Sequence, residues 1–271
     1  MVKNKEKTLS SFAKRTLAAL VMLPITIAVI YSGYPMVDMF VLIIGSALAW
    51  EWAKMTAKAD RDIYVLTYLL ALVSSTLIYK TPMTVAFIAA LTIFAFFKAK
   101  AEKRRLLITL GVPYIAVGIG ALLWLYYAIG IYGMIWYLLV ICGVDIGGYI
   151  VGSNLKGPKL APKISPNKTW SGLVGGVILS AVLSVSFIAI LDCLSMQASS
   201  VNDKLLFAGI AALLAVVAQI GDLVESAIKR SVGVKDSSNL IPGHGGVFDR
   251  IDGMIFAAPF TYILFILIFN I

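Results

Sequence analysis

Nine stretches of this chain are long enough and apolar enough to cross a lipid bilayer, and they constrain its fold more than any other feature. A spanning helix needs roughly 20 apolar residues. The sequence is 60% hydrophobic, whereas soluble domains are usually about 45–50% apolar. We therefore predict an all-α, polytopic integral membrane helical bundle. The expected spans are residues 16–32, 36–53, 63–79, 83–97, 106–127, 132–152, 171–191, 204–221 and 253–270.

Basic residues are unevenly distributed among the segments that join these spans. Because cytoplasmic loops carry an excess of lysine and arginine, the basic side is predicted to be cytoplasmic, with the N-terminus inside. Anionic lipid and an anionic soluble substrate explain the net charge of +9 without a nucleic acid. Apart from Lys80 and Lys204, every lysine and arginine falls in residues 1–15, 54–62, 98–105, 153–170 or 222–252.

The chain divides into an N-terminal membrane region, residues 1–105, and a C-terminal region, residues 106–271, that carries most of the unusual polar groups. Glu51 lies between Trp50 and Trp52 near a span end. Since tryptophan is typical of the membrane interface, we expect both rings to be interfacial anchors and Glu51 to reach toward water there.

Asp145, in the sequence GVDIGGYIVGS, lies near the inner end of the sixth expected span. A carboxylate within a span is costly and is a functional candidate. The glycines around it suit either close helix packing or the close approach of a ligand.

The segment 153–170 reads SNLKGPKLAPKISPNKTW, with four lysines and no acid. Its three prolines favour turns over a helix. Such a loop suits the binding of a polyphosphate. The excess of lysine and arginine in cytoplasmic loops is by itself enough to explain why the loop is positive. Thr169 is also placed to cap the next helix. The candidate substrate-binding residues here are Lys163, Ser165, Asn167, Lys168 and Thr169.

Residues 222–252 hold five of the 14 acids, four bases and the only histidine. Asp222, Ser226 and Lys229 follow i, i+4, i+7 spacing and share one helix face, and Gly233 is predicted to end that helix. Oxygen ligands favour Mg²⁺ or Mn²⁺, while lysine and arginine bind phosphate oxygens. The segment therefore indicates a metal ion that faces phosphates.

A glycine-rich loop follows, and its backbone could approach a phosphate closely. Asp249 and Asp252 then begin the last helix, so Asp222 and Asp249, with Asp145, are predicted to converge on one divalent cation. Structural interpretations also stay open. His244 is compatible with a purely structural role, and the helix face that carries acids and bases is compatible with a solvated surface.

The stretch SAIKRSVGVKDSSNLIPGHGGVFDRID resembles the signature of phosphatidate cytidylyltransferases, also called CDP-diacylglycerol synthases. The stretches VDIGGYIVG, LAPKISPNKTWSG and AQIGDLVES also resemble this family, whereas the first hundred residues match only in being hydrophobic. The matching positions of the signature are Ser226, Lys229, Arg230, Lys235, Asp236, Pro242, His244, Gly245, Gly246, Asp249, Arg250 and Asp252.

The resemblance implies an enzyme that transfers CMP from CTP to phosphatidic acid, with Mg²⁺ as cofactor, as a possible homodimer whose site faces the cytoplasm at a bacterial inner membrane. It implies that Asp222 and Asp249 hold the metal, supported by Asp145 or Asp252. Substrate-binding roles extend to Lys235, Asp236, Gly245 and Gly246. The implied catalytic set is Asp222, Ser226, Lys229, Arg230, His244, Asp249, Arg250 and Asp252.

Three other functions stay open on the sequence. A CTP-dependent lipid kinase would release CDP rather than pyrophosphate. An ion-coupled transporter would use Asp145 and Asp222 as a carboxylate relay. A nonenzymatic membrane scaffold would tolerate loss of the acids.

Overall fold

The computed structural model describes residues 22, 24–77, 81–195, 198–241 and 245–270, and these are almost entirely helical. A short helix over residues 24–32 precedes the long ones, and the 3₁₀ turn η1 (Ala99–Ala101) follows α4. The all-α membrane fold class is therefore confirmed. The long helices are α2 (Met36–Thr56), α3 (Arg61–Leu77), α4 (Pro82–Lys98), α5 (Arg105–Leu155), α6 (Trp170–Ser195), α7 (Val201–Ser231) and α8 (Phe248–Phe269).

Six helices of the described part are long and apolar enough to cross a membrane, namely all of these except α3. The 51 residues of α5 are two helices joined at Gly130, where the backbone is non-helical (φ 67°, ψ −171°). These two parts correspond to the expected spans 106–127 and 132–152. The chain is thus a multi-pass integral membrane protein, while the number nine stays a prediction.

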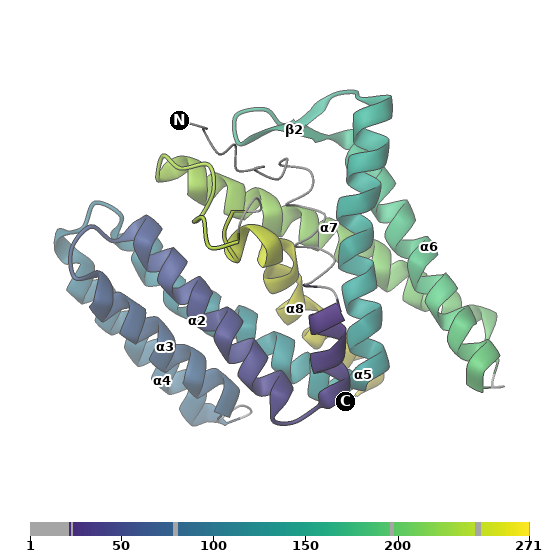
Figure 1. Cartoon of the computed structure of the whole chain (residues 1–271), viewed down its shortest axis with the longest axis horizontal. Coiled ribbons are helices and arrows are strands. Elements are labelled where there is room, and N and C mark those ends of the chain that lie inside the picture. Colours follow the sequence, from purple (N-terminus) through teal and green to yellow (C-terminus); the bar gives the residue numbers. More distant parts are fainter. Residues whose placement is uncertain (1–21, 23, 78–80, 196–197, 242–244, 271) are drawn as a thin grey trace, which may run out of the picture.

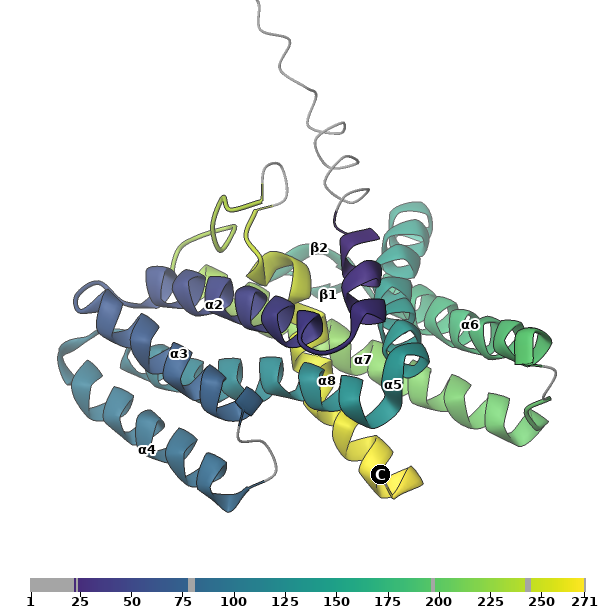
Figure 2. The ribbon, with the colours of Figure 1, turned by 60° about the horizontal axis from the view of Figure 1, so that its bottom comes forward.

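Helix α5 is the centre of the bundle and packs against α2, α3, α4, α6, α7 and α8. In Figure 1 its second part runs up the view to a small β-hairpin, with α6 beside it, while α2, α3 and α4 lie together on the left. The buried apolar core follows α5 from Ile108 to Val144. Figure 2 shows the first part of α5 running beneath α2 before the chain turns.

Glycines let α5 and α6 approach each other to backbone contact. A Cβ atom built on Gly147 would lie 2.5 Å from the carbonyl oxygen of Gly175, and one on Gly176 would lie 2.9 Å from that of Val144. Atoms that close would force the helices apart, so only glycine fits. Close helix packing, one of the two predictions for the glycines around Asp145, is therefore confirmed at Gly147.

The lysine-rich segment leaves α5 after Leu155 and forms a two-stranded antiparallel hairpin, β1 (Lys159–Ala161) and β2 (Ser165–Thr169). The non-helical path was predicted, but the strands were not. The Oγ1 atom of Thr169 accepts a 3.1 Å hydrogen bond from the amide of Gly172, which confirms Thr169 as a cap of α6.

Two expectations for the end of α2 are wrong. Glu51 and Trp52 are 0% and 1% exposed, and the indole nitrogen of Trp52 donates a 3.0 Å hydrogen bond to the carbonyl of Leu107 on α5. The reason is that α5 and the segment preceding α8 cover this end of α2. Trp50 alone stays partly exposed, with the ammonium of Lys54 4.7 Å from its ring centre.

Candidate active site

The acids and bases of the C-terminal region meet at one end of the bundle. Helix α7 ends at Ser231, and Gly233 turns the chain with φ 79°, so the predicted helix end is confirmed. Helix α8 begins at Phe248, which places Asp249 and Asp252 in its first turns. The last turns of α7 therefore lie beside the first turns of α8, with the hairpin close by (Figure 1).

Three carboxylates form a cluster between α7 and α8. One oxygen from each of Asp222, Glu225 and Asp252 lies within 4.8 Å of the other two. Glu225 is fully buried, and its Oε1 atom has no hydrogen-bond partner among the described residues. Clustered carboxylate oxygens are the ligands that hard divalent cations prefer. This donor set fits a cation such as Mg²⁺.

Asp145 approaches the same cluster from α5. Together with Asp222, Arg250 and Asp252 it lines a small cavity of about 20 Å³. A cavity needs roughly 10–15 Å³ of this kind of volume to hold one water molecule. The space between these side chains is therefore sized for a single small species. The structure thus brings together Asp145 and Asp222, two of the three predicted metal ligands.

Lys229 carries the central positive charge of the site. Its ammonium nitrogen lies 2.6 Å from Glu225 and 2.6 Å from Asp249, so it bridges the two helices. One turn earlier on the same face, the hydroxyl of Ser226 donates to Asp222 at 3.4 Å. Arg230 is exposed and points toward the hairpin, where its Nε atom donates to the carbonyl of Ile164 at 3.4 Å.

The third predicted metal ligand, Asp249, lies outside the cluster of three carboxylates. Its Oδ1 atom pairs with Lys229. Its Oδ2 atom accepts hydrogen bonds from the amides of Ser237 and Gly246, at 2.9 and 2.7 Å, and from the hydroxyl of Ser237 at 2.9 Å. These partners make Asp249 an anchor for the loop before α8. Its role as a metal ligand stays a prediction.

The hairpin joins the site through Lys168, which forms an ion pair with Asp222. Lys163 and Asn167 are exposed on the hairpin and Ser165 is partly buried there, while Lys235 and Asp236 are exposed on the loop after α7. Gly245 has φ 86°, and its carbonyl accepts a 2.8 Å hydrogen bond from the amide of Ile241. His244 lies outside the described residues.

This arrangement of acids and lysines at one end of a membrane bundle can be compared with known proteins. The model of the Cytidylyltransferase family matches residues 13–268, which is nearly the whole chain. The protein belongs to the cytidylyltransferase family. Its sequence is also 30% identical over 267 residues to the phosphatidate cytidylyltransferase of Rickettsia conorii, covering 98% of this chain and 94% of that one.

Other relatives match over slightly less than half of this chain. The phosphatidate cytidylyltransferase of Bacillus subtilis is 44% identical over 126 residues, which is 46% of this chain and 44% of the relative. That of Brucella suis is 42% identical over 133 residues, covering 48% of this chain and 45% of the relative. This chain therefore matches slightly less than half the length of these two curated relatives.

Glu225 is a residue of this site that the sequence analysis does not single out. It lies three positions after Asp222, and that i, i+3 spacing is the signal that could have found it. On a helical projection it flanks the stripe formed by Asp222, Ser226 and Lys229. Packing of α8 against α7 turns that flank into the interior of the site.

An apolar groove begins beside the acids. It has a volume of about 420 Å³ and is lined by residues of α2, α5, α7 and α8. Val224 and Ile228 are lining residues next to Glu225 and Lys229 in the sequence. Tyr114 also lines it, and the hydroxyl of this residue has no hydrogen-bond partner among the described residues. The groove thus offers an apolar wall, while the Tyr114 hydroxyl itself is buried.

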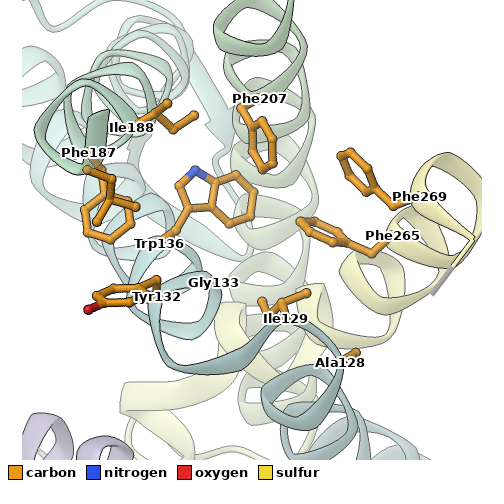
Figure 3. A pocket seen from close by; sticks show the side chains of 11 residues that line it. Ala128, Ile129, Tyr132, Gly133, Trp136, Phe187, Ile188, Phe207, Phe265 and Phe269 are labelled. Atoms are coloured by element: carbon orange, nitrogen blue, oxygen red, sulfur yellow. The ribbon is translucent and has the colours of Figure 1, made fainter. Parts of the chain in front are cut away.

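A second apolar pocket, of about 320 Å³, lies at the other end of the bundle. Figure 3 shows Trp136 facing Phe207 and Phe265 in a wall of aromatic and aliphatic side chains. Phe207 precedes Asp222 by 15 positions on α7, which is about 22 Å at roughly 1.5 Å per residue. Among the described residues, the lining of this second pocket has no acid and no base. The pocket is therefore a poor match for a nucleotide.

Proposed function

We propose that this protein transfers CMP from CTP to phosphatidic acid, giving CDP-diacylglycerol and pyrophosphate. The observation that carries the proposal is the convergence of Asp222, Glu225 and Asp252 beside Lys229 in a member of the cytidylyltransferase family. Relatives named phosphatidate cytidylyltransferase support the choice of substrates.

In the proposed reaction, a phosphate oxygen of the lipid attacks the α-phosphorus of CTP. The bond from that phosphorus to the bridging oxygen of the β-phosphate breaks, and pyrophosphate leaves with the electron pair. Both reactants are anions, so the site must neutralise their repulsion and align them in line. No protein nucleophile is needed.

We propose that Asp222, Glu225 and Asp252 hold Mg²⁺, with Asp145 at the edge of the same cavity. The ion would supply charge neutralisation at the phosphates. The chemistry of the donor set supports this choice, since all the clustered atoms are carboxylate oxygens and Glu225 has an oxygen without a hydrogen-bond partner among the described residues. Glu225 is thus added to the metal ligands that the sequence predicts.

The cations of the site are proposed to bind the phosphates. Lys168 reaches the cluster from the hairpin, and Lys229 reaches it from α7. Arg230, exposed near the hairpin, can bind a phosphate with two parallel hydrogen bonds. Charges from two separate elements would enclose a triphosphate between them.

Phosphatidic acid is proposed to place an acyl chain in the groove that begins beside Glu225. The apolar wall of the groove suits an acyl chain. The basic loops indicate that this end of the bundle faces the cytoplasm, where CTP is found. We further propose a bacterial inner-membrane location and a homodimer, both on the family resemblance alone.

Purified protein in mixed micelles with phosphatidic acid and labelled CTP tests the function. Label at the α-phosphate is expected in the lipid product, label at the γ-phosphate in pyrophosphate, and EDTA is expected to stop both. Lipid labelled from the γ-phosphate would show a kinase instead. Ion flux into liposomes without nucleotide would favour the transporter.

A further inference from the structure

Glu51, in the N-terminal region, is bound to the segment that precedes α8. Its Oε1 atom accepts hydrogen bonds from the hydroxyl of Ser238 and the amide of Val247, at 2.6 and 2.9 Å. Its Oε2 atom accepts from the hydroxyl of Ser237 and the amide of Phe248, at 3.0 and 2.8 Å. These donors lie 186–197 positions later in the sequence. One carboxylate therefore ties together both ends of the loop 237–248.

The two amides explain why a carboxylate suits this place. The first amides of a helix have no partner within it, and the N-terminal residue Val247 provides no side-chain cap for α8. A carboxylate at a helix N-terminus satisfies these donors and interacts favourably with the helix dipole. Glu51 thus caps α8 from another helix, and the four donors offset the cost of burying it.

A continuous path of contacts leads from Glu51 to the carboxylate cluster. The hydroxyl of Ser237 lies 3.0 Å from Glu51 and 2.9 Å from Asp249, and its single proton can be given to one of them at a time. Asp249 pairs with Lys229, which also pairs with Glu225. Glu51 is therefore linked by direct contacts to the ammonium group of Lys229.

Packing around the carboxylate fixes this path. A Cβ atom on Gly246 would overlap the hydroxyl of Ser237 and come within 2.5 Å of Glu51. The neighbouring Trp52 packs its ring 5.4 Å from that of Phe248, so two successive residues of α2 hold the first residue of α8. The described residues around Gly246 are therefore closely packed against Glu51.

We propose that Glu51 is a positioning residue of the transfer reaction. Through Ser237 and the loop amides it holds Asp249, and through Asp249 it sets the place of Lys229 beside the carboxylate cluster. The catalytic consequence rests on the proposed function, whereas the clamp on the loop does not.

The serines at 237 and 238 provide a matched pair of variants. Both side chains are buried and both donate to Glu51, but only Ser237 also contacts Asp249. We expect Ser237→Ala to lower kcat about tenfold, the effect of roughly one hydrogen bond, and Ser238→Ala to stay within about threefold of the wild type. The KM for CTP should change little in both. Equal losses of kcat in the two variants, or no loss in either, would overturn the proposal.

Glu51→Gln tests the clamp without turnover. Hydrogen exchange at the amides of Val247 and Phe248 should become about tenfold faster than in the wild type, because an amide group accepts these bonds less strongly than a carboxylate. Unchanged exchange in a folded variant would overturn the clamp and the positioning role with it. A wild-type protein without CMP transfer would refute the proposed function alone, since the exchange measurement would still decide the clamp.

Discussion

The ammonium nitrogen of Lys229 lies 2.6 Å from a carboxylate oxygen of Asp249, and this pair joins the last turns of α7 to the first turn of α8. The same nitrogen lies 2.6 Å from Glu225, so one cation is shared by two carboxylates. Lys229 therefore links the two helices at the edge of the carboxylate cluster, in addition to the close packing of Gly253 on Ala218.

Removal of the Lys229 side chain is predicted to lower both stability and activity. Lys229→Ala leaves two carboxylates without their cation, and breaking a buried pair typically costs about 3–5 kcal/mol of unfolding free energy. Activity should fall at least about 100-fold, the loss expected when one stabilising donor is removed. Denaturation in detergent and steady-state kinetics measure both effects. Near-normal kcat/KM in a folded variant would contradict this assignment.

The control for this change is Lys204→Ala, on the same helix. Lys204 also forms an ion pair, with Asp192 at 2.8 Å, but its side chain is 29% exposed and lies at the far end of α7. The pair is more exposed than that of Lys229 and lies away from the carboxylate cluster, so the variant should keep nearly all its activity.

The carboxylate cluster predicts the metal dependence of the enzyme. Asp222→Asn and Asp252→Asn each remove one proposed metal ligand, so each should abolish turnover at ordinary Mg²⁺ concentrations or raise the concentration for half-maximal rate at least about tenfold. A magnesium titration of kcat measures this. Asp62→Asn, an exposed acid on α3, is the control; an unchanged titration curve in Asp222→Asn would remove that residue from the metal site.

Asp249→Asn distinguishes a metal ligand from an anchor of the loop. If Asp249 only holds Lys229 and the loop, kcat falls strongly while the magnesium concentration for half-maximal rate stays the same. A large shift of that concentration would instead make Asp249 a ligand, as the sequence predicts. Kinetics at several magnesium concentrations separates the two results.

Loss of the hairpin residue Lys168 is predicted to weaken the binding of CTP. Lys168→Ala removes the cation that reaches Asp222 from β2, and we expect the KM for CTP to rise about tenfold, which corresponds to roughly one charge-assisted hydrogen bond. Lys159→Ala, an exposed lysine of the same hairpin, should leave KM within about twofold. Equal effects in the two variants would reduce the role of Lys168 to general positive charge.

The contact between α5 and α6 predicts a loss of stability when its glycines are enlarged. Gly147→Ala forces a methyl group against the backbone of Gly175, and overpacking of this kind costs about 1–3 kcal/mol. Gly209→Ala on α7 meets nothing within 4 Å and should be neutral or slightly stabilising. Unfolding midpoints in one detergent compare the two.

Much of the fold is predictable because membrane helices are encoded locally. Long apolar runs locate the helices, and the break of α5 at Gly130 falls in the gap between two expected spans. Asp222 and Asp252 are also identifiable from residue type alone, since acids are rare in such a chain. These features depend only on neighbours in the sequence.

Features that depend on distant partners were not predictable. Glu51 beside two tryptophans has the pattern of an interfacial residue, and nothing near it indicates donors more than 180 positions away. The burial of Glu225 depends on how α8 rotates against α7. The hairpin lacks the alternation of a strand, because its prolines and lysines interrupt any period of two.

The backbone contact between α5 and α6 has a consequence for the hairpin that carries Lys168. The hairpin connects these two helices, and near its ends Gly152 and Gly172 are so tightly placed that a Cβ atom on either would come within 3.0 Å of a neighbouring atom. Because the hairpin begins and ends in this tightly packed contact, its two ends are held in place. The contact therefore fixes the position from which Lys168 reaches Asp222.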